Sequence, residues 1–367
     1  MSPLLSSNSP ASHKLSPIGM DIVVSRLEGF GNRFNDIHLT ADNALGTWRF
    51  KIDGKDAAGV IHVPSANYVK AKLTRLILAH PVTDTPTIAI EPARFPAVSV
   101  DCDRFVLKSF DLGKMALSMR PRPSGLRLES LTLTSPAIHI KAQGDWQSAS
   151  GIPMSRFDIS AQGPDLRGLL RRFNYSAAAL EGGPTQIEIQ VRWPGTPADF
   201  MLSKLNGRLK ITVDKGQLLN VDNHIGRIFG LLSIEGLRRR LSLDFNDLFK
   251  QGFSFDKLEG SFAIEKGHAY TNNLSMIGPS ARIHISGRTG LVNQDYDQLV
   301  TVTPALSSSL LTAGAFFGPV GAGVGATMLL AQQVFTSLPA RIDWVLQRQY
   351  TVTGSWNDPV VKSLISH

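Results

Sequence analysis

The sequence predicts a mainly β protein in which a strand–turn–strand unit is repeated along an extended sheet. The first observation is a pair of similar stretches, LTLTSPAIHIKAQG at residues 131–144 and LSMIGPSARIHISG at residues 274–287. Each stretch contains apolar residues two apart, then a proline, then a second alternating run and a glycine. Alternation with a period of two places the apolar side chains on one face of a strand. The proline lacks an N–H group and therefore belongs at a strand start or edge.

The second observation is another repeated template, at residues 205–216 and 258–267. The first version is longer by two residues, which keeps the same face apolar, whereas one extra residue would have reversed it. Repetition of such units favours an extended, repetitive sheet over a fold built around one catalytic constellation.

Composition is the third observation. The chain has 367 residues, 32 Gly, 21 Pro and only 19% charged residues, which suits many short strands and turns. Its length is enough for two or three ordinary domains or one elongated domain. Cys102 is the only cysteine, which excludes an intrachain disulfide and a cysteine-based metal cluster. The formal net charge of +8 favours membrane surfaces, lipid head groups or nucleic acid as partners, or it describes an ordinary basic surface.

The first half of the chain reads mostly as strands. Residues 1–20 are rich in Ser and Pro and lack the apolar core of a secretory signal, so a disordered leader is expected there. From residue 20 to about 63, alternating runs are separated by Gly and Asn/Asp, as hairpins require. Four prolines within 81–97 predict a linker or an irregular crossing between two halves. Strands resume from 98 to 146.

The second half adds short helices to the strands. Apolar residues at helical spacing predict helices over 164–175 and near 224–234, and one further turn at 244–250. A clean alternating strand is expected at 187–193, between the first two helices. A final strand at 349–353 closes the ordered part.

One segment departs from this pattern because residues 298–340 contain no charged residue. Its middle part, residues 310–338, is rich in Gly, Ala and Leu and has the ~20 residues that a membrane-spanning helix needs. Its glycines and proline weaken a simple spanning helix. Three interpretations stay open, namely a buried or interfacial helical hairpin, a transmembrane span, and a mobile Gly-rich loop.

We expect residues 310–338 to form a C-terminal helical segment that contacts a membrane surface or covers the last strands as a plug. Membrane contact would use apolar side chains and nearby basic residues. The side chains expected to make this contact are Leu310, Leu311, Phe316, Phe317, Leu329, Leu330 and Phe335.

The sequence shows no catalytic constellation. No two histidines stand in an HxxxH or HxH pair, and there is no GxSxG elbow or P-loop, so we expect no catalytic residue, no metal and no cofactor. His139 and His284 lie on the strand face opposite the isoleucines and are expected to be exposed. Nucleic acid is not expected as a partner, because the basic residues are not interleaved with an exposed aromatic platform.

What remains is a continuous aliphatic face on nearly every strand, with few helices to cover it. Two sheets could bury these faces in a sandwich, which composition alone favours, or one sheet could curl into a trough lined for lipid. In either case the neighbours Glu188, Lys210, Arg282 and His284 should face solvent. The predicted inward set, which would bind lipid in a trough, is Ile187, Ile189, Val191, Leu209, Ile211, Val213, Phe262, Ile264, Ile283 and Ile285.

A resemblance to a known family favours the trough. Residues 230–256 read GLLSIEGLRRRLSLDFNDLFKQGFSFD, and residues 287–302 read GRTGLVNQDYDQLVTV. Both resemble the C-terminal region of the AsmA-like superfamily, in its YhdP branch, which is related to the bridge-like lipid transfer proteins. The SSSL run at 307–310 and the ending YTVTGSWNDPV at 350–360 fit the same pattern. The match is most specific from about 202 to 361.

The resemblance implies an elongated, curled antiparallel sheet that forms an apolar groove, with a few short helices and a C-terminal helical segment. Members of the family are periplasmic proteins, anchored in the inner membrane of Gram-negative bacteria and implicated in moving phospholipid toward the outer membrane. Residues 21–200 would form one groove segment and residues 201–367 the AsmA-like C-terminal region. We expect the anchor to lie outside this sequence.

The expected partners are therefore phospholipid, the outer-membrane surface and other periplasmic or membrane proteins. An alternative function from another class is a structural or assembly factor for outer-membrane proteins, which would hold client strands at the edges of the sheet.

Overall fold

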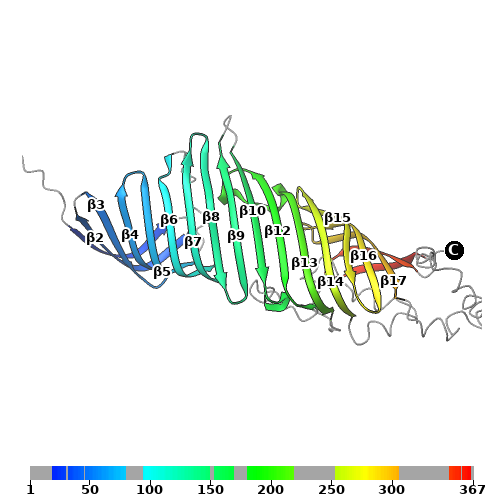
Figure 1. Ribbon diagram of the computed structural model, residues 1–367. Coiled ribbons are helices and arrows are strands. Elements are labelled where there is room, and N and C mark those ends of the chain that lie inside the picture. Colours follow the sequence, from blue (N-terminus) through cyan, green and yellow to red (C-terminus); the bar gives the residue numbers. More distant parts are fainter. Residues whose placement is uncertain are drawn as a thin grey trace, which may run out of the picture.

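The protein is described by a computed structural model as one 19-stranded sheet that curls along its length (Figure 1). The residues described are 19–29, 32–44, 46–79, 94–148, 153–168, 180–218, 253–305, 347–356 and 358–364.

The strands follow one another along the sheet in chain order. Those before residue 150 are β1 (Gly19–Gly29), β2 (Asn32–Ala44), β3 (Thr47–Asp53), β4 (Ala57–Ser65), β5 (Tyr68–Leu78), β6 (Ala97–Leu107), β7 (Phe110–Arg122), β8 (Gly125–Ser135) and β9 (Ile138–Gln147). Those after it are β10 (Met154–Gly163), β11 (Leu180–Gly182), β12 (Thr185–Pro194), β13 (Asn206–Leu218), β14 (Phe253–Glu265), β15 (His268–Ile277), β16 (Ala281–Gly290), β17 (Asp295–Pro304), β18 (Arg348–Ser355) and β19 (Pro359–Leu364).

Almost every strand pairs antiparallel with its neighbour in sequence. The short β11 pairs with β13 in line with β12, and β10 pairs directly with β12. The exception in direction is the parallel pair β5–β6, which aligns Tyr68 with Ala97 and Leu78 with Leu107. A parallel pair requires the chain to return along the length of the strands between Leu78 and Ala97. This agrees with the crossing predicted from the prolines of 81–97, of which residues 81–93 lie outside the described part.

The two copies of the first repeated template are hairpins, as predicted, whereas each copy of the second template lies along a single strand. The stretch 131–144 covers the end of β8 and most of β9, and the stretch 274–287 covers the end of β15 and most of β16. Pro136 and Pro279 lie in the turns of these two hairpins, where no ladder N–H is needed. Both copies of the second template belong to one antiparallel pair, β13–β14, with Leu209 opposite Phe262.

The turn between β14 and β15 shows how local chemistry fixes the register. Glu265 pairs with His268, and the two residues between them, Lys266 and Gly267, have φ angles of 46° and 81°. Positive φ at both central positions is the type I′ geometry that matches the twist of antiparallel strands. Gly267 adopts it without strain because it lacks Cβ.

The mainly β prediction and the single curled sheet are confirmed, and the sandwich is wrong because every described strand belongs to one sheet. The sheet is not closed, since β1 and β19 each pair on one side only among the described strands. It also runs without interruption from β12 to β13, across the predicted segment boundary near residue 200.

Little helix accompanies the sheet in the described part. Residues 166–168 are helical, which agrees with the predicted start of the 164–175 helix, and two 3-10 turns follow as η3 (Pro197–Asp199) and η4 (Leu202–Lys204). The remaining predicted helices, at 224–234 and 244–250, lie outside the described residues.

The C-terminal helical segment at 310–338 also lies outside the described residues, and it is not borne out. None of the helices in the described residues has both the length and the apolarity that crossing a membrane requires. Of the residues assigned to the predicted leader, Gly19 and Met20 belong to β1, and residues 1–18 lie outside the described part.

Buried side chains gather into separate clusters along the sheet. The largest cluster joins β12 to β19 and includes Val213, Phe255 and Ile283. A second cluster in β5–β8 is formed around Leu73, Cys102 and Leu133, and a third includes Phe34, Ile37 and Ala57 near the first strands. The hydrophobic core is therefore distributed along the molecule instead of being concentrated at one centre.

Candidate functional site

An unbroken row of apolar side chains crosses the sheet from β1 to β14. Residues directly opposite one another on neighbouring strands share a face, so the pairing register can be followed from strand to strand. We call this set the middle row. It consists of Met20, Ala41, Phe50, Ile61, Ala71, Val100, Leu117, Leu131, Ala142, Ile159, Ile189, Leu209 and Phe262.

Two further rows flank the middle row on the same face, two residues away along each strand. One contains Leu73, Cys102, Met115, Leu133, Ile140, Ala161, Ile187 and Ile211. The other contains Val69, Val98, Met119, Leu128, Gly144, Phe157, Val191, Gly207 and Ile264. The three rows form a continuous surface without a charged side chain, which we call the apolar face.

The opposite face has a different chemistry. The row next to the middle row reads Thr40, Lys51, Val60, Lys72, Asp101, Ala116, Thr132, Lys141, Ser160, Glu188, Lys210 and Ser261. We call this side the outer face. Alternation along each strand therefore separates an apolar from a polar surface over most of the sheet.

Seven of the ten side chains of the predicted inward set belong to these rows, and the pairs Val213–Leu258, Leu258–Met276 and Met276–Ile283 place Val213, Ile283 and Ile285 on the same side of the sheet, but their burial differs. Val213 is fully buried, and the inward residues of β14 and β16 are at most 6% exposed. The five inward residues of β12 and β13 other than Val213 are only half-buried. The apolar face is therefore open in the middle of the sheet and closed toward its C-terminal end.

The predicted outward neighbours follow the expected alternation. Glu188, Lys210 and Arg282 are exposed, and His284 is half-buried on the outer face. His139 is also half-buried, with its Nδ1 3.1 Å from the hydroxyl of Thr134. Within the described part of the chain, no group of three His, Cys, Asp or Glu side chains is placed to hold a metal ion.

Ionisable groups on the apolar face are kept neutral by burial. Desolvation raises the pKa of the Cys102 thiol, and its Sγ donates a 3.2 Å hydrogen bond to the carbonyl oxygen of Arg104. Burial likewise raises the pKa of Tyr296 and of Tyr350 in the C-terminal strands. Because burial disfavours the charged form of such groups, these side chains add no charge to the face.

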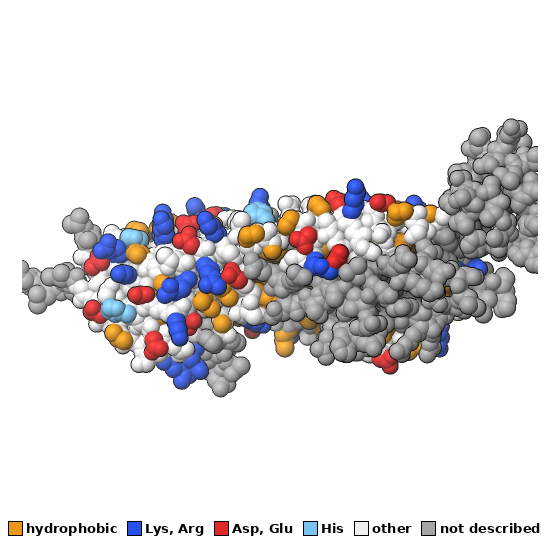
Figure 2. Space-filling view, turned by 90° about the horizontal axis from the view of Figure 1, so that it is seen from below, with side chains coloured by type: hydrophobic (Ala, Val, Ile, Leu, Met, Phe, Trp, Pro, Cys, Tyr) orange, Lys and Arg blue, Asp and Glu red, His pale blue; other side chains and the backbone are white. Residues whose placement is uncertain are grey.

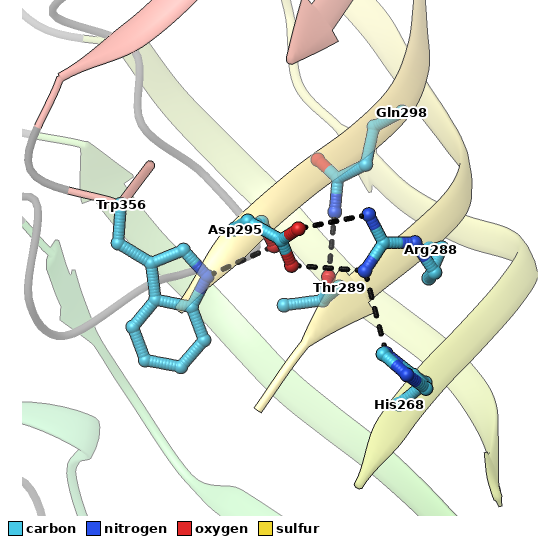
Figure 3. A network of polar contacts seen from close by, with 6 residues as sticks. All are labelled: His268, Arg288, Thr289, Asp295, Gln298 and Trp356. Atoms are coloured by element: carbon cyan, nitrogen blue, oxygen red, sulfur yellow. Dashed lines mark hydrogen bonds and ion pairs between the residues drawn. The ribbon is translucent and has the colours of Figure 1, made fainter. Parts of the chain in front are cut away.

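A polar network fixes the C-terminal strands to one another (Figure 3). Arg288 donates two hydrogen bonds to the carboxylate of Asp295, at 2.9 and 3.1 Å, and its Nη1 lies 3.3 Å from Nδ1 of His268. The Trp356 indole donates to the backbone oxygen of Asp295 at 3.2 Å. These contacts connect β15, β16 and β17 with the residue that follows β18.

Asp295 is the group whose ionisation this network controls. The hydrogen bond from Arg288 lowers the pKa of the Asp295 carboxyl, and the same contact raises the pKa of the guanidinium. A bidentate pair of this kind is stronger and more specific in geometry than a single surface ion pair. The network therefore holds the C-terminal strands of the sheet together.

A buried polar pair joins β16 and β17, the two strands that carry Arg288 and Asp295. The side-chain amide of Gln298 donates a 2.8 Å hydrogen bond to the hydroxyl of Thr289, and these side chains are 4% and 1% exposed. Thr289 pairs with Tyr296 across β16 and β17. A buried amide is tolerated because its hydrogen bond offsets the cost of removing it from water.

The sequence prediction missed the N-terminal half of the apolar face. Phe50, Ile61, Val100 and Leu117 belong to the middle row, yet none was included in the inward set. Each lies in an alternating run, and that alternation was the available signal. The membrane contacts predicted at Leu310 and the six other apolar side chains of 310–338 lie outside the described residues.

Comparisons with known proteins agree with this architecture. The family model described as YhdP protein matches residues 1–361. The chain is also similar to the intermembrane phospholipid transporter YhdP of Escherichia coli (strain K12), with 27% identity over 251 residues. That alignment covers 65% of this chain and 19% of the relative, so the matched region spans about a fifth of the relative's length. No solved structure matches the chain.

Proposed function

Because the chain belongs to the YhdP family, we propose that its apolar face is a section of a groove that conducts phospholipid between two membranes. The observation that supports this most directly is the middle row, which remains apolar from β1 to β14 and is half-buried over much of its length. An acyl chain gains about 0.8 kcal/mol for each CH₂ group that it removes from water. A continuous apolar row offers this gain at every position along the molecule.

The exposure of the apolar face favours a lipid that moves along the sheet over one that is held at a single position. Contiguous apolar patches of this extent are rare on monomeric proteins and mark places where apolar partners bind. A row made only of apolar side chains holds an acyl chain without favouring one position. Lipid would therefore move along the groove by diffusion, and this function requires no covalent chemistry and no cofactor.

The proposal also includes the compartment in which the chain works and the partners that it contacts. We place the chain in the periplasm of a Gram-negative bacterium, as the C-terminal section of a longer bridge whose end faces the outer membrane. Residues 310–338 and their apolar side chains would provide the membrane contact or cover the groove's end. Phospholipid is the cargo, and other periplasmic or membrane proteins would complete the path.

Ile211→Asp tests the proposal. The side chain is half-buried on the apolar face, so water relieves part of the cost of the new carboxylate while the charge obstructs an acyl chain. We expect protein that remains folded by circular dichroism but retains much less phospholipid after purification, as measured by mass spectrometry. The matched control is Lys210→Asp, which introduces a carboxylate at the adjacent exposed position of the outer face. Equal lipid content in both variants and in the unmodified protein would contradict the groove.

A second candidate function is supported by the edge strand β1. Its side chains Met20, Ile22, Val23 and Leu27 are 44%, 40%, 76% and 43% exposed, on a strand that pairs only with β2 among the described strands. Such an edge could hold strands of unfolded outer-membrane proteins. If lipid-free protein suppresses aggregation of an unfolded outer-membrane barrel protein and Ile22→Lys abolishes this, the assembly role is favoured.

A further inference from the structure

A row of arginines lies on the outer face near one set of strand ends. Arg120 of β7 pairs with Arg127 of β8, and Arg156 of β10 pairs with Arg192 of β12. Between them, Asp145 of β9 pairs with both Arg127 and Arg156. We call Arg120, Arg127, Arg156 and Arg192 the arginine row. Neighbouring strands are about 4.8 Å apart, so the row presents closely spaced guanidinium groups.

Two of these cations have no ion-pair partner among the described residues. Arg127 lies 3.5 Å from Asp145, and Arg120 lies 3.0 Å from Glu129. Arg156 and Arg192 are exposed and directly opposite each other, and neither forms an ion pair with any described residue. Like charges at directly opposite positions are destabilising. An anion bound between Arg156 and Arg192 would remove this repulsion.

The arginine row lies beside the outermost residues of the apolar face, near the strand ends. Each unpaired arginine is adjacent in sequence to a residue of that face, with Arg156 next to Phe157 and Arg192 next to Val191. Both lie in the third position from a strand end, close to the rim of the sheet. A molecule with its chains on the apolar face and its polar end at this rim would come within reach of the flexible arginine side chains.

An indole at the same level marks the boundary between apolar and polar surroundings. Trp193 stacks on Phe157 at a centroid distance of 5.3 Å, and its Nε1 donates a 2.9 Å hydrogen bond to the carbonyl oxygen of Thr196. An amphipathic ring with an apolar body and a satisfied polar tip is typical of such boundaries. The strand ends here therefore combine stacked aromatic side chains on one face with exposed arginines on the other.

We propose that the arginine row binds the phosphodiester head groups of phospholipids whose acyl chains lie on the apolar face. Guanidinium groups bind phosphate oxygens in a bidentate manner, and no lysine takes part in the row. The row would select phosphate-bearing lipids over neutral lipids with the same chains and would keep head groups at this rim. This inference rests on the proposed groove and adds to it the polar end of the cargo.

The test compares two lipids that differ only in the phosphoglycerol head group. Phosphatidylglycerol and diacylglycerol with the same fluorescently labelled acyl chains are titrated onto the full chain and onto Arg156→Gln/Arg192→Gln. Each charged hydrogen bond contributes more than 1 kcal/mol, so we expect the affinity for phosphatidylglycerol to fall about tenfold or more. The affinity for diacylglycerol should not change, and the salt dependence of phosphatidylglycerol binding should decrease.

A control variant separates location from net charge. Lys51→Gln/Lys72→Gln removes two exposed positive charges from the outer face of β3 and β5, away from the arginine row, and it should keep the preference for phosphatidylglycerol. If the arginine variant keeps that preference as well, the inference is overturned, and an acidic protein becomes the expected partner of the arginine row. If neither lipid binds to the unmodified chain, the groove itself is wrong. Equal loss of both lipids in the arginine variant would also overturn the inference, because it would indicate damage to the apolar face.

Discussion

Ile211 and Ile283 point to the same face of the sheet, yet they differ in what surrounds them. Ile211 is half-buried, whereas Ile283 is 4% exposed within the largest cluster of buried side chains. A carboxylate at position 283 would be removed from water without a partner, which costs several kcal/mol. Position 211 is therefore the one at which a charge separates lipid binding from folding.

The stability that the Asp295 carboxylate contributes should depend on pH. Its pKa is lowered by the hydrogen bond from Arg288, so the stability that it contributes is present above its unfolded pKa of about 3.9 and is lost as the pH falls through the folded value. We expect Asp295→Asn to lower Tm at neutral pH. The gap in Tm between the two proteins should stay constant down to about pH 5 and shrink below about pH 4.

Asp158→Asn is the matched control for this series. Asp158 is exposed in β10 and has no ion-pair partner in the described part of the chain, so its replacement should leave Tm nearly unchanged at neutral pH. Thermal unfolding followed by circular dichroism from pH 7 to pH 3 provides the comparison. A gap for Asp295→Asn that persists unchanged at pH 3 would show that the Arg288 contact does not act through charge.

At the scale of the element, two glycines let neighbouring strands approach closely beside the apolar face. A Cβ on Gly144 would lie 2.4 Å from Cδ1 of Phe157, and a Cβ on Gly207 would lie 2.0 Å from the carbonyl oxygen of Gln190. Backbone cannot move aside as a flexible side chain can. Gly207 is therefore required by the close approach of β12 and β13.

Gly207→Ala should destabilise the sheet locally. Overpacking of this kind costs about 1–3 kcal/mol, and here the new methyl group would force the ladder between β12 and β13 apart. Hydrogen exchange should show faster exchange of the amides in these two strands. Gly29→Ala is the control, because its Cβ would meet nothing within 4 Å. Equal protection in both variants would mean that the close contact at Gly207 is not needed.

Individual hairpins could be predicted from the sequence, but the way their faces join could not. The alternation of Ile283 and Ile285 determines which residues share a side, and the structure confirms it. In β8 the alternation shifts, because a bulge lies between Leu128 and Leu131 and both residues face the same side. One extra residue reverses the parity of everything beyond it. Tracing the apolar face through the N-terminal strands therefore required the pairing register.

The curl of the sheet and the uneven burial of the apolar face could not be predicted from the sequence alone. Alternating aliphatic runs suit both a sandwich and a trough, composition alone favoured the sandwich, and only the family resemblance favoured one curled sheet. The half-burial of Ile211 and the full burial of Val213, two residues apart on one strand, depend on neighbours distant in sequence. The arginine row was missed for the same reason, since Arg120 and Arg192 are brought into one line by strands that are far apart in the chain.

For the whole molecule, the division of the core into separate clusters predicts unfolding in parts. Ile37 is 1% exposed in the cluster near the first strands, and that cluster shares no buried residue with the one spanning β12 to β19. Ile37→Ala should cost about 2–5 kcal/mol locally. In a structure where each strand contacts mainly its neighbours, such a loss spreads only weakly.

Hydrogen exchange followed by mass spectrometry checks this expectation. Amides of β2 to β4 should exchange faster in Ile37→Ala, while those of β14 to β18 should keep their protection. Val300→Ala, in the large cluster, is the converse control and should affect the C-terminal strands alone. A uniform loss of protection along the chain in either variant would mean that the sheet unfolds as one cooperative unit.

Since nearly every strand pairs with its neighbour in sequence, the fold has no preferred number of strands. One additional hairpin between β7 and β8 would move the two ends of the molecule apart by about 9–10 Å and leave the other hairpins unchanged. A barrel or a sandwich would have to be rebuilt after such an insertion, because its closure depends on strand number. The length of such a sheet can therefore be altered by duplicating a short stretch of sequence, without rebuilding the strands on either side.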